Sequence, residues 1–465
     1  MPRHRTLVRL TVPAGAVLGV ATGALLIALG GATASRTTTG SPDGTSQIEA
    51  THLPQLLTPL DERVELGYDA YCLPADDREG EEACDVVGSA FVRSGDRGAF
   101  RELPLRVEPA RSEGRLVTAV PDAVARSPQG FSYYAVLVDR ATGASVTLPA
   151  GGADAPQRSL PLGKSVDVDL GTHRFGSARD ARARIADARW GAGPLDAGLE
   201  QGKSLPPIGA SSFDVASDGS VYVLDEAKRR ALRWSRGAAS PTAIPLEIDG
   251  TIADLAVSDT GHLYVLETSG PLNGPAHLRS FTLAGRALAT TALADRAYRV
   301  DTGPAGAPFV LGQTSGQWMR AGAEGARLAP PNLQRLSGRP GRSLRGGGEV
   351  VVHRIGNEVR AALVGPGAAR RMWRIRSDTA LAEVQLAEPI GSRLVLVTRV
   401  YADARDEFLV LVLGAKGLVE RFSVASADWA ETAPLSRFRL EGSSLYQLGS
   451  TPAGLFVDRF DLEEE

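Results

Sequence analysis

The sequence predicts an all-β protein in three parts: an N-terminal export segment, a small β-sandwich and a β-propeller. Two observations carry this prediction. Short runs of β-forming residues, separated by turns of Gly, Pro and Asp, follow one another along most of the chain, and one phrase recurs: "SDGSVYVLDEAKRRALRWS" begins at Ser217 and "SDTGHLYVLE" at Ser258. With 465 residues, of which 43% are hydrophobic, the chain can form two or three domains with buried cores.

Residues 1–36 have the pattern of a signal peptide or a membrane anchor helix. Three arginines precede an uncharged stretch, "VLGVATGALLIALG" lies within it, and "ATA" offers small residues for cleavage. The apolar run of about 18 residues also suits an uncleaved anchor, so cleavage and anchoring both stay open. Because the positive end should stay cytoplasmic, we expect the rest of the chain outside, as an extracellular or cell-envelope protein. Membrane contact is expected only through this segment.

Residues 37–59 are polar and rich in Gly, Ser and Thr, which predicts a flexible linker. The next domain contains the only two cysteines, Cys72 and Cys84. In an exported chain, two closely spaced cysteines favour one disulfide. A metal pair is the alternative, but two thiols without a nearby histidine make an incomplete site. The acidic stretch between the cysteines is expected to be a solvated loop.

Residues 60–163 predict a small β-sandwich. Runs such as "GSAFVR" and "FSYYAVLVDR" follow one another at spacings of about 10–15 residues, and "VDRATGASVTL" reads as a hairpin that turns at Ala141–Gly143. About seven short strands in roughly 100 residues resemble the architecture of immunoglobulin and fibronectin domains. The resemblance is one of architecture, because the signature tryptophan of immunoglobulin domains is missing.

Residues 164–465 predict a β-propeller. In "SFDVASDGSVYVLDEAKRRALRWS" three strands are separated by turns, the first at Asp218-Gly219, and "TAIPLEI" supplies a fourth. Four antiparallel strands in about 42 residues make one blade. Tyr222 and Tyr264 mark the same position in two successive copies, and weaker copies continue to the C-terminus. Six copies predict six blades; seven is the alternative if Val166–Trp190 forms one more. Radial closure hides strand edges.

The first copy resembles an NHL-type repeat. The residues that match are Phe213, Val215, Asp218, Gly219, Tyr222, Val223, Asp225, Arg230 and Trp234, with Lys228 where the repeat usually has Asn. The second copy keeps Gly261, Tyr264 and Val265 but has Glu267 in place of the Asp. The resemblance implies a propeller of this superfamily and structural roles for these residues, including a salt bridge between Asp225 and Arg230. It implies no activity, because propellers serve enzymes, receptors and scaffolds alike.

The residues that carry chemistry are sparse. No GxSxG, HxH or HExxH sequence occurs, so we predict no catalytic residue, cofactor-binding residue or metal ligand. The net charge of −3 argues against nucleic-acid binding. Eleven arginines lie between Arg327 and Arg376. They predict solvated surface, with a basic face for an anionic partner as the alternative.

These observations favour an exported or membrane-tethered binding protein of the cell envelope, with no cofactor. The ligand would be a protein or an envelope polymer bound on one propeller face, with the loop at Thr268–His277 as a recognition element. Two alternatives stay open. One is a hydrolase or lyase that acts on a secreted small molecule and resembles lactonase-like propeller enzymes. The other is a passive structural module.

Overall fold

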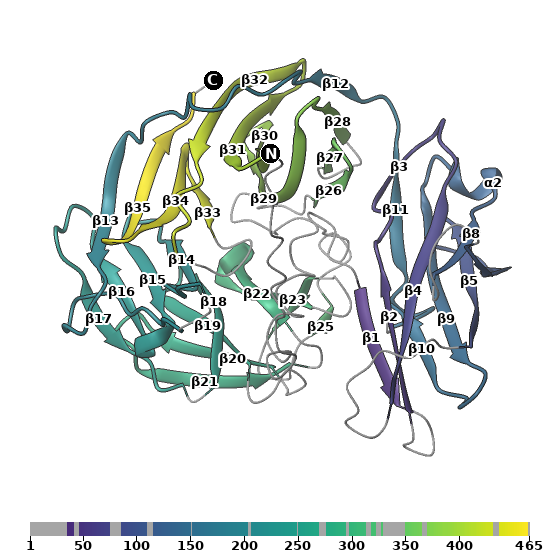
Figure 1. Ribbon diagram of the computed structural model, residues 1–465, viewed down its shortest axis with the longest axis horizontal. Coiled ribbons are helices and arrows are strands. Elements are labelled where there is room, and N and C mark those ends of the chain that lie inside the picture. The colour runs from purple at the N-terminus through teal and green to yellow at the C-terminus, as the bar shows by residue number, and fades with distance from the viewer. Residues whose placement is uncertain are drawn as a thin grey trace, which may run out of the picture.

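The computed structural model describes most of the chain after residue 34. The described residues are 35–40, 46–74, 85–108, 115–149, 151–202, 206–248, 250–268, 276–293, 297–312, 318–321, 327–328, 349–364, 370–430 and 437–463. They form a β-sandwich and a β-propeller that lie side by side (Figure 1). The predicted export segment lies outside the described residues. Within them, no helix has the length and apolar character needed to cross a membrane.

The sandwich consists of two sheets. The first has the order β1 (Ser35–Gly40), β2 (Ser46–His52), β4 (Glu65–Pro74), β8 (Arg115–Ala119) and β7 (Arg106–Val107). The second has the order β3 (Leu57–Pro59), β11 (Gln157–Leu162), β9 (Phe131–Asp139), β5 (Val86–Ser94) and β6 (Arg101–Pro104), with β10 (Ser145–Leu148) also paired to β9. The short helix α2 (Asp122–Ala125) follows β8.

Alternation along the strands builds the sandwich core. In β9, Phe131, Tyr133, Ala135 and Leu137 are buried, while Tyr134, Val136 and Val138 between them are half-buried. A strand points successive side chains to opposite faces, so one face of β9 packs inward against residues such as Tyr68 of β4. The expected hairpin is present: β9 pairs with β10, and Gly143 at its turn has φ 72°.

Residues 37–59 were expected to be a flexible linker, but part of this stretch forms strands. Residues 46–52 and 57–59 are strands, and Ile48 and Leu57 are fully buried. Ile48 lies in the sandwich core, where β2 pairs along its whole length with β4. The ladder with β4, together with the burial of Ile48, compensates for the weak β-propensity of a stretch rich in Ser, Thr and Gln.

In the part of the propeller that the structure describes there are six four-stranded sheets. Figure 1 shows the sheets arranged around a common centre. Four of them are formed by consecutive strands. These are β14 (Ser212–Val215), β15 (Val221–Asp225), β16 (Arg230–Trp234) and β17 (Thr242–Pro245); β18 (Thr251–Val257), β19 (His262–Thr268), β20 (Ala276–Thr282) and β21 (Ala287–Ala292); β22 (Ala297–Thr302), β23 (Pro308–Gly312), β24 (Trp318–Arg320) and β25 (Arg327–Leu328); and β29 (Ala380–Ile390), β30 (Arg393–Ala402), β31 (Arg405–Gly414) and β32 (Gly417–Ala425). Two short 3-10 turns, Glu226–Lys228 and Pro304–Gly306, lie between strands.

The other two sheets are completed from the N-terminal side. Strands β26 (Glu349–Ile355), β27 (Glu358–Val364) and β28 (Arg370–Arg376) receive β12 (Val166–Asp169), which runs parallel to β28. Strands β33 (Phe438–Glu441), β34 (Ser444–Thr451) and β35 (Gly454–Asp461) receive β13 (Ala183–Arg189), antiparallel to β35. The stretch Val166–Trp190 therefore contributes outer strands to two different sheets and does not form a further sheet of its own.

A strap, residues 170–182, joins β12 to β13 across the outer strand β32. Ala178 forms a bridge with Ser423 of β32, and the Arg421 guanidinium donates to the Leu170 carbonyl at 2.7 Å. The buried His173 ring lies 2.9 Å from the Glu407 carboxylate, measured from Nε2 to Oε2. Thus residues before the first repeat bind three sheets of the propeller together.

The repeat residues occupy structural positions. Gly219 and Gly261 have φ of 82° and 83° at equivalent turns, a backbone conformation that favours glycine. Tyr222 and Trp234 are buried between sheets. Tyr264, in the same register as Tyr222, packs at the edge of the next inter-sheet core.

Candidate functional site

The Asp225–Arg230 pair of the first repeat holds a loop in place. Arg230 Nε donates to Asp225 Oδ2 at 2.8 Å, and both side chains are buried. The other carboxylate oxygen of Asp225 accepts the Gly198 amide at 3.0 Å. The Arg230 guanidinium also donates to the carbonyls of Pro194 and Asp196. The pair therefore anchors the segment that leads from β13 into the first sheet.

Lys228 adds to this anchor. Its ammonium donates to three backbone carbonyls of the same segment: Gly191 at 2.6 Å, Gly193 at 3.0 Å and Asp196 at 2.8 Å. Three acceptors match the three donors of a lysine ammonium. Lys228 therefore performs a structural task in the turn between β15 and β16.

Glu267 shows how the second copy compensates for its changes. Its Oε1 accepts the Gly250 amide at 2.7 Å, as Asp225 accepts Gly198, and its Oε2 lies 3.1 Å from Nε of Arg279. Arg279 stands one strand over, on β20. A carboxylate at the end of the second strand that pairs with an arginine of the third is therefore kept, although the residues have changed.

A buried acid–arginine cluster occupies the inner strands of neighbouring sheets. Asp254 Oδ2 accepts the amide of Val300 in the next sheet at 2.9 Å, and Asp214 Oδ2 accepts that of Val257 at 2.7 Å. Arg439, only 2% exposed, approaches Asp214 at 3.6 Å and Asp254 at 3.4 Å. These carboxylates fasten inner strands to one another and are neutralised by a guanidinium. A divalent cation placed between them would be repelled by Arg439.

Nothing among the described side chains groups three or more His, Cys, Asp or Glu residues in a metal-binding arrangement. His173 faces Glu407, His262 Nδ1 lies 3.0 Å from the Thr260 hydroxyl, and His353 is fully buried. No free cysteine occurs in the same part of the chain. Cys72 lies in β4, and Cys84 lies outside the described residues, so the disulfide stays a prediction.

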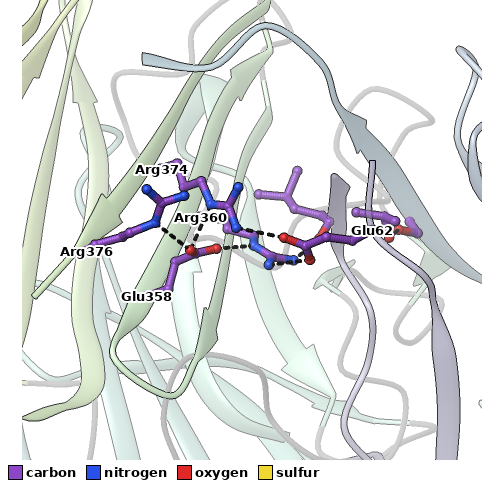
Figure 2. A network of polar contacts seen from close by, with 8 residues as sticks. Glu62, Glu358, Arg360, Arg374 and Arg376 are labelled. Carbon is purple, nitrogen blue, oxygen red and sulfur yellow. Dashed lines mark hydrogen bonds and ion pairs between the residues drawn. The ribbon is translucent and has the colours of Figure 1, made fainter. Parts of the chain in front are cut away.

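Part of the arginine-rich stretch lies inside the molecule (Figure 2). Arg360 and Arg374 of the propeller donate to the two oxygens of Glu62 of the sandwich at 2.8 and 2.7 Å. Both also bind Glu358, and Arg376 joins Glu358 at 3.2 Å. The interpretation of this stretch as solvated surface is therefore wrong for Arg360, whose side chain is 7% exposed in a domain interface.

The feature best suited to ligand binding is an aromatic pair on two connections between sheets. Trp190 follows β13 and Trp429 follows β32; their ring centroids are 6.3 Å apart at 36°. Trp429 is 36% exposed, and Trp190 Nε1 donates to the Thr451 carbonyl at 2.8 Å. A large amphipathic ring held at low entropic cost is a typical recognition element.

Hydrogen bonds hold the backbone next to the pair. The Ala430 amide donates to the Ser450 hydroxyl at 2.8 Å, and the Ser450 amide donates to the Ala427 carbonyl at 2.7 Å. A Cβ at Gly209 would lie 2.9 Å from the Trp190 ring, so Gly209 permits close packing there. Ala427 has φ 45°, an uncommon conformation for alanine that is often found at functional sites. These contacts fasten the backbone next to Trp429 and pack the Trp190 ring closely against Gly209.

Charged groups surround the pair. The Asp428 carboxylate, next to Trp429, lies 3.4 Å from Arg399 and 3.9 Å from Arg437. Burial lowers the pKa of Arg437, and Asp428 opposes that shift. Arg399 and Asp428 are about a third exposed, at 33% and 32%. An apolar platform beside exposed hydrogen-bonding groups can hold a ligand that has both apolar and hydroxyl-bearing surfaces.

Glu226 is a second unusual group, in the turn between β15 and β16. Burial raises its pKa to about 7, the Ile252 amide opposes the shift, and the Glu200 carboxylate adds to it. A carboxyl group that titrates near neutral pH can donate or accept a proton under physiological conditions.

Trp190, Trp429 and Glu226 are not among the residues that the sequence pattern indicates. One signal was available for Trp429: it stands in the polar, turn-rich "SADWAETAP", where an aromatic residue has no strand to belong to. The expected recognition loop at Thr268–His277 lies for the most part outside the described residues. The acidic residues between the cysteines, from Asp76 to Glu82, lie outside the described residues too.

No protein-family model matches the chain, and the search of curated proteins found no match. Solved structures that are similar to it are all-β and propeller-like. Virginiamycin B lyase from Staphylococcus aureus is 12% identical with a TM-score of 0.32, over 55% of this chain and 95% of the lyase. A candidate gluconolactonase is 12% identical with a TM-score of 0.32, over 60% and 99%. A protein of unknown function from Bacteroides thetaiotaomicron is 11% identical with a TM-score of 0.32, over 91% and 100%. Similarities this low carry no argument about activity or ligand.

Proposed function

We propose that the chain is an exported or membrane-tethered β-propeller binding protein of the cell envelope, with six blades of NHL type. Each four-stranded sheet is one blade in this proposal, and the ligand binds at Trp190 and Trp429. The single observation that carries the proposal is this indole pair, fixed by its backbone and exposed at Trp429. The buried carboxylates of the inner strands serve the scaffold.

The ligand class follows from the chemistry of the site. Indole faces contact the apolar faces of sugar rings or side chains, while Asp428 and Arg399 offer an acceptor and donors beside them. This combination favours a hydroxyl-bearing envelope polysaccharide over a purely apolar ligand. A protein ligand is the other outcome that the binding test can return.

The test is co-sedimentation of the purified protein with insoluble envelope polysaccharide, with bound protein measured against polymer concentration. Trp429→Ala should weaken binding at least 10-fold, since a buried aromatic contact at the centre of an interface is worth about 2 kcal/mol or more. Leu288→Ala is the matched control, because Leu288 is 44% exposed on β21, away from the pair. Equal binding by Trp429→Ala and the native chain would rule out the site.

The alternative function, a propeller hydrolase or lyase, has one observation in its favour: Glu226, whose pKa near 7 suits a general acid or base. Under this alternative, turnover of a lactone or cyclic peptide substrate would depend on the protonation of Glu226. Glu226→Gln would abolish turnover and leave sedimentation with the polymer unchanged. Absence of turnover in the native chain over pH 5–9 leaves the binding proposal as the better account.

A further inference from the structure

The sandwich packs against one face of the sheet that contains β26, β27 and β28. Seven apolar residues meet there: Leu56, Leu57, Leu160 and Leu162 of the sandwich, and Val351, Ala362 and Met372 of the propeller. The Glu62–Arg360–Arg374 network joins the same two surfaces (Figure 2). One apolar cluster and one ion-pair network therefore connect the domains.

His353 points into this interface. It lies two residues after Val351 on β26, so both side chains project from the same face of the sheet. The His353 side chain is fully buried, and neither ring nitrogen has a partner at hydrogen-bond distance among the described residues. The Leu57 carbonyl of the sandwich is near enough to favour a proton on the ring. Across the ladder its partner residue is Arg360, whose guanidinium also reaches the Leu57 carbonyl of the sandwich at 3.5 Å.

The charged groups around His353 all disfavour a proton on it. Arg360 faces it from β27, Arg354 from its own strand, and His52 from the sandwich. The carboxylates that pair with Arg360, Glu62 and Glu358, are engaged by arginines. Burial, followed by Arg360, lowers the pKa of His353 from 6.5 to about 4. The docked interface therefore requires a neutral imidazole.

We propose that acidification releases the sandwich from the propeller, and that His353 is the group whose protonation drives the release. A charged imidazole in the closed interface has the Leu57 carbonyl as a favourable neighbour, but burial and the adjacent Arg360 guanidinium disfavour the charge more strongly. Separation of the two domains lets water solvate it. The propeller sheets stay folded, because His353 meets the sandwich at the face of one sheet. The contacts between the propeller sheets are unchanged by the release.

The direction and size of the effect follow from linkage. The docked state has the lowered pKa, so docking is fully stable above pH 6.5 and loses stability as the pH falls toward 4. A difference of about 2.5 pKa units corresponds to a maximal change of about 300-fold in the docking equilibrium, of which about 30-fold is reached at pH 5. Burial also lowers the pKa of His52 to about 4. Its ring is bonded to Gly67 and Tyr133 inside the sandwich, so its protonation acts on the sandwich fold, and the His353 variants separate the two effects.

The test is hydrogen–deuterium exchange of the full chain between pH 7.5 and 4.5, corrected for the intrinsic pH dependence of exchange. Segments 53–62 and 350–364 should lose protection with a midpoint between pH 6.5 and 4. All five tryptophans lie after residue 163, so their fluorescence reports on the propeller alone and should stay native. Small-angle scattering should show a larger radius of gyration in the same pH range.

His353→Leu should remove the transition in this range, because leucine fits an apolar interface and does not titrate. His353→Gln is a second non-titrating variant, in case the leucine disturbs folding. His277→Gln, a half-buried histidine of β20, is the matched control and should keep the native midpoint. Three results would each overturn the proposal. They are the same midpoint in all variants, no release of the native chain above pH 4, and loss of the tryptophan signal together with docking.

Discussion

Several single residues in this chain have structural roles that the sequence around them does not predict. Lys228 lies in the turn between β15 and β16, and its ammonium binds the carbonyls of Gly191, Gly193 and Asp196. Glu267 and Arg279 rebuild, with different residues, the pairing that Asp225 and Arg230 make in the first repeat. Repeat decay in the sequence therefore does not mean loss of the interaction.

Lys228→Met should destabilise the propeller by about 1.5–3 kcal/mol, because three carbonyls lose a charged donor while the apolar stem of the side chain is kept. The free energy of unfolding, measured by tryptophan fluorescence in urea, tests this expectation. Lys416→Met is the control: Lys416 is exposed, and its substitution should change stability by less than about 0.5 kcal/mol. A loss as small as that of the control would show that the carbonyls are satisfied without the lysine.

At the scale of strands and turns, backbone geometry makes the turn glycines necessary. Gly261 has φ 83°, and a Cβ built there meets no atom within 4 Å. Any cost of Gly261→Ala therefore comes from backbone strain alone. We expect about 1–2 kcal/mol from chemical denaturation. Gly163→Ala, where the space is also open and φ is not left-handed, should be neutral within about 0.5 kcal/mol. Equal effects of the two substitutions would contradict this explanation.

Local signals explain which elements could be predicted. The turn at Asp218-Gly219 and the strands beside it were predictable because Asp-Gly, alternation and β-branched residues act within a few positions. Strand β2 was not, because its position depends on the ladder with β4 and not on its own composition. The outer strands β12 and β13 could not be predicted from the sequence either. Residues 166–169 pair with 373–376, some 200 positions away, and no local pattern encodes such a partner.

The candidate sites were hidden for the same reason. Trp190 and Trp429 come together only when two connections meet on the folded propeller. Glu62 and Arg374 are 312 positions apart and belong to different domains. The composition near Arg360 correctly indicated a basic stretch. Whether an arginine of this stretch is exposed or buried depends on the docking of the sandwich.

At the scale of the whole molecule, the strap 170–182 connects two sheets across a third. Glu407 of β31 is its main anchor: Oε2 contacts His173, and Oε1 accepts the Gly176 amide at 2.6 Å. The His173 ring is buried, so loss of the carboxylate leaves its ring nitrogen without an acceptor, while the Gly176 amide loses its acceptor at a more exposed position. The cost of such a loss is about 1–3 kcal/mol for each group.

Glu407→Ala should therefore loosen the strap and, through it, the outer strands β12 and β13. We expect faster amide exchange in residues 166–189 and a stability loss of about 2–4 kcal/mol, while exchange in the sandwich strands β5 and β9 stays native. Glu407→Gln keeps one oxygen acceptor and should show a smaller loss. Glu65→Ala, at an exposed glutamate of the sandwich, is the control. If Glu407→Ala accelerates exchange only at residues 173–176, the strap is a local loop and does not link the sheets; if β12 and β13 respond together, the N-terminal strands hold the propeller closed.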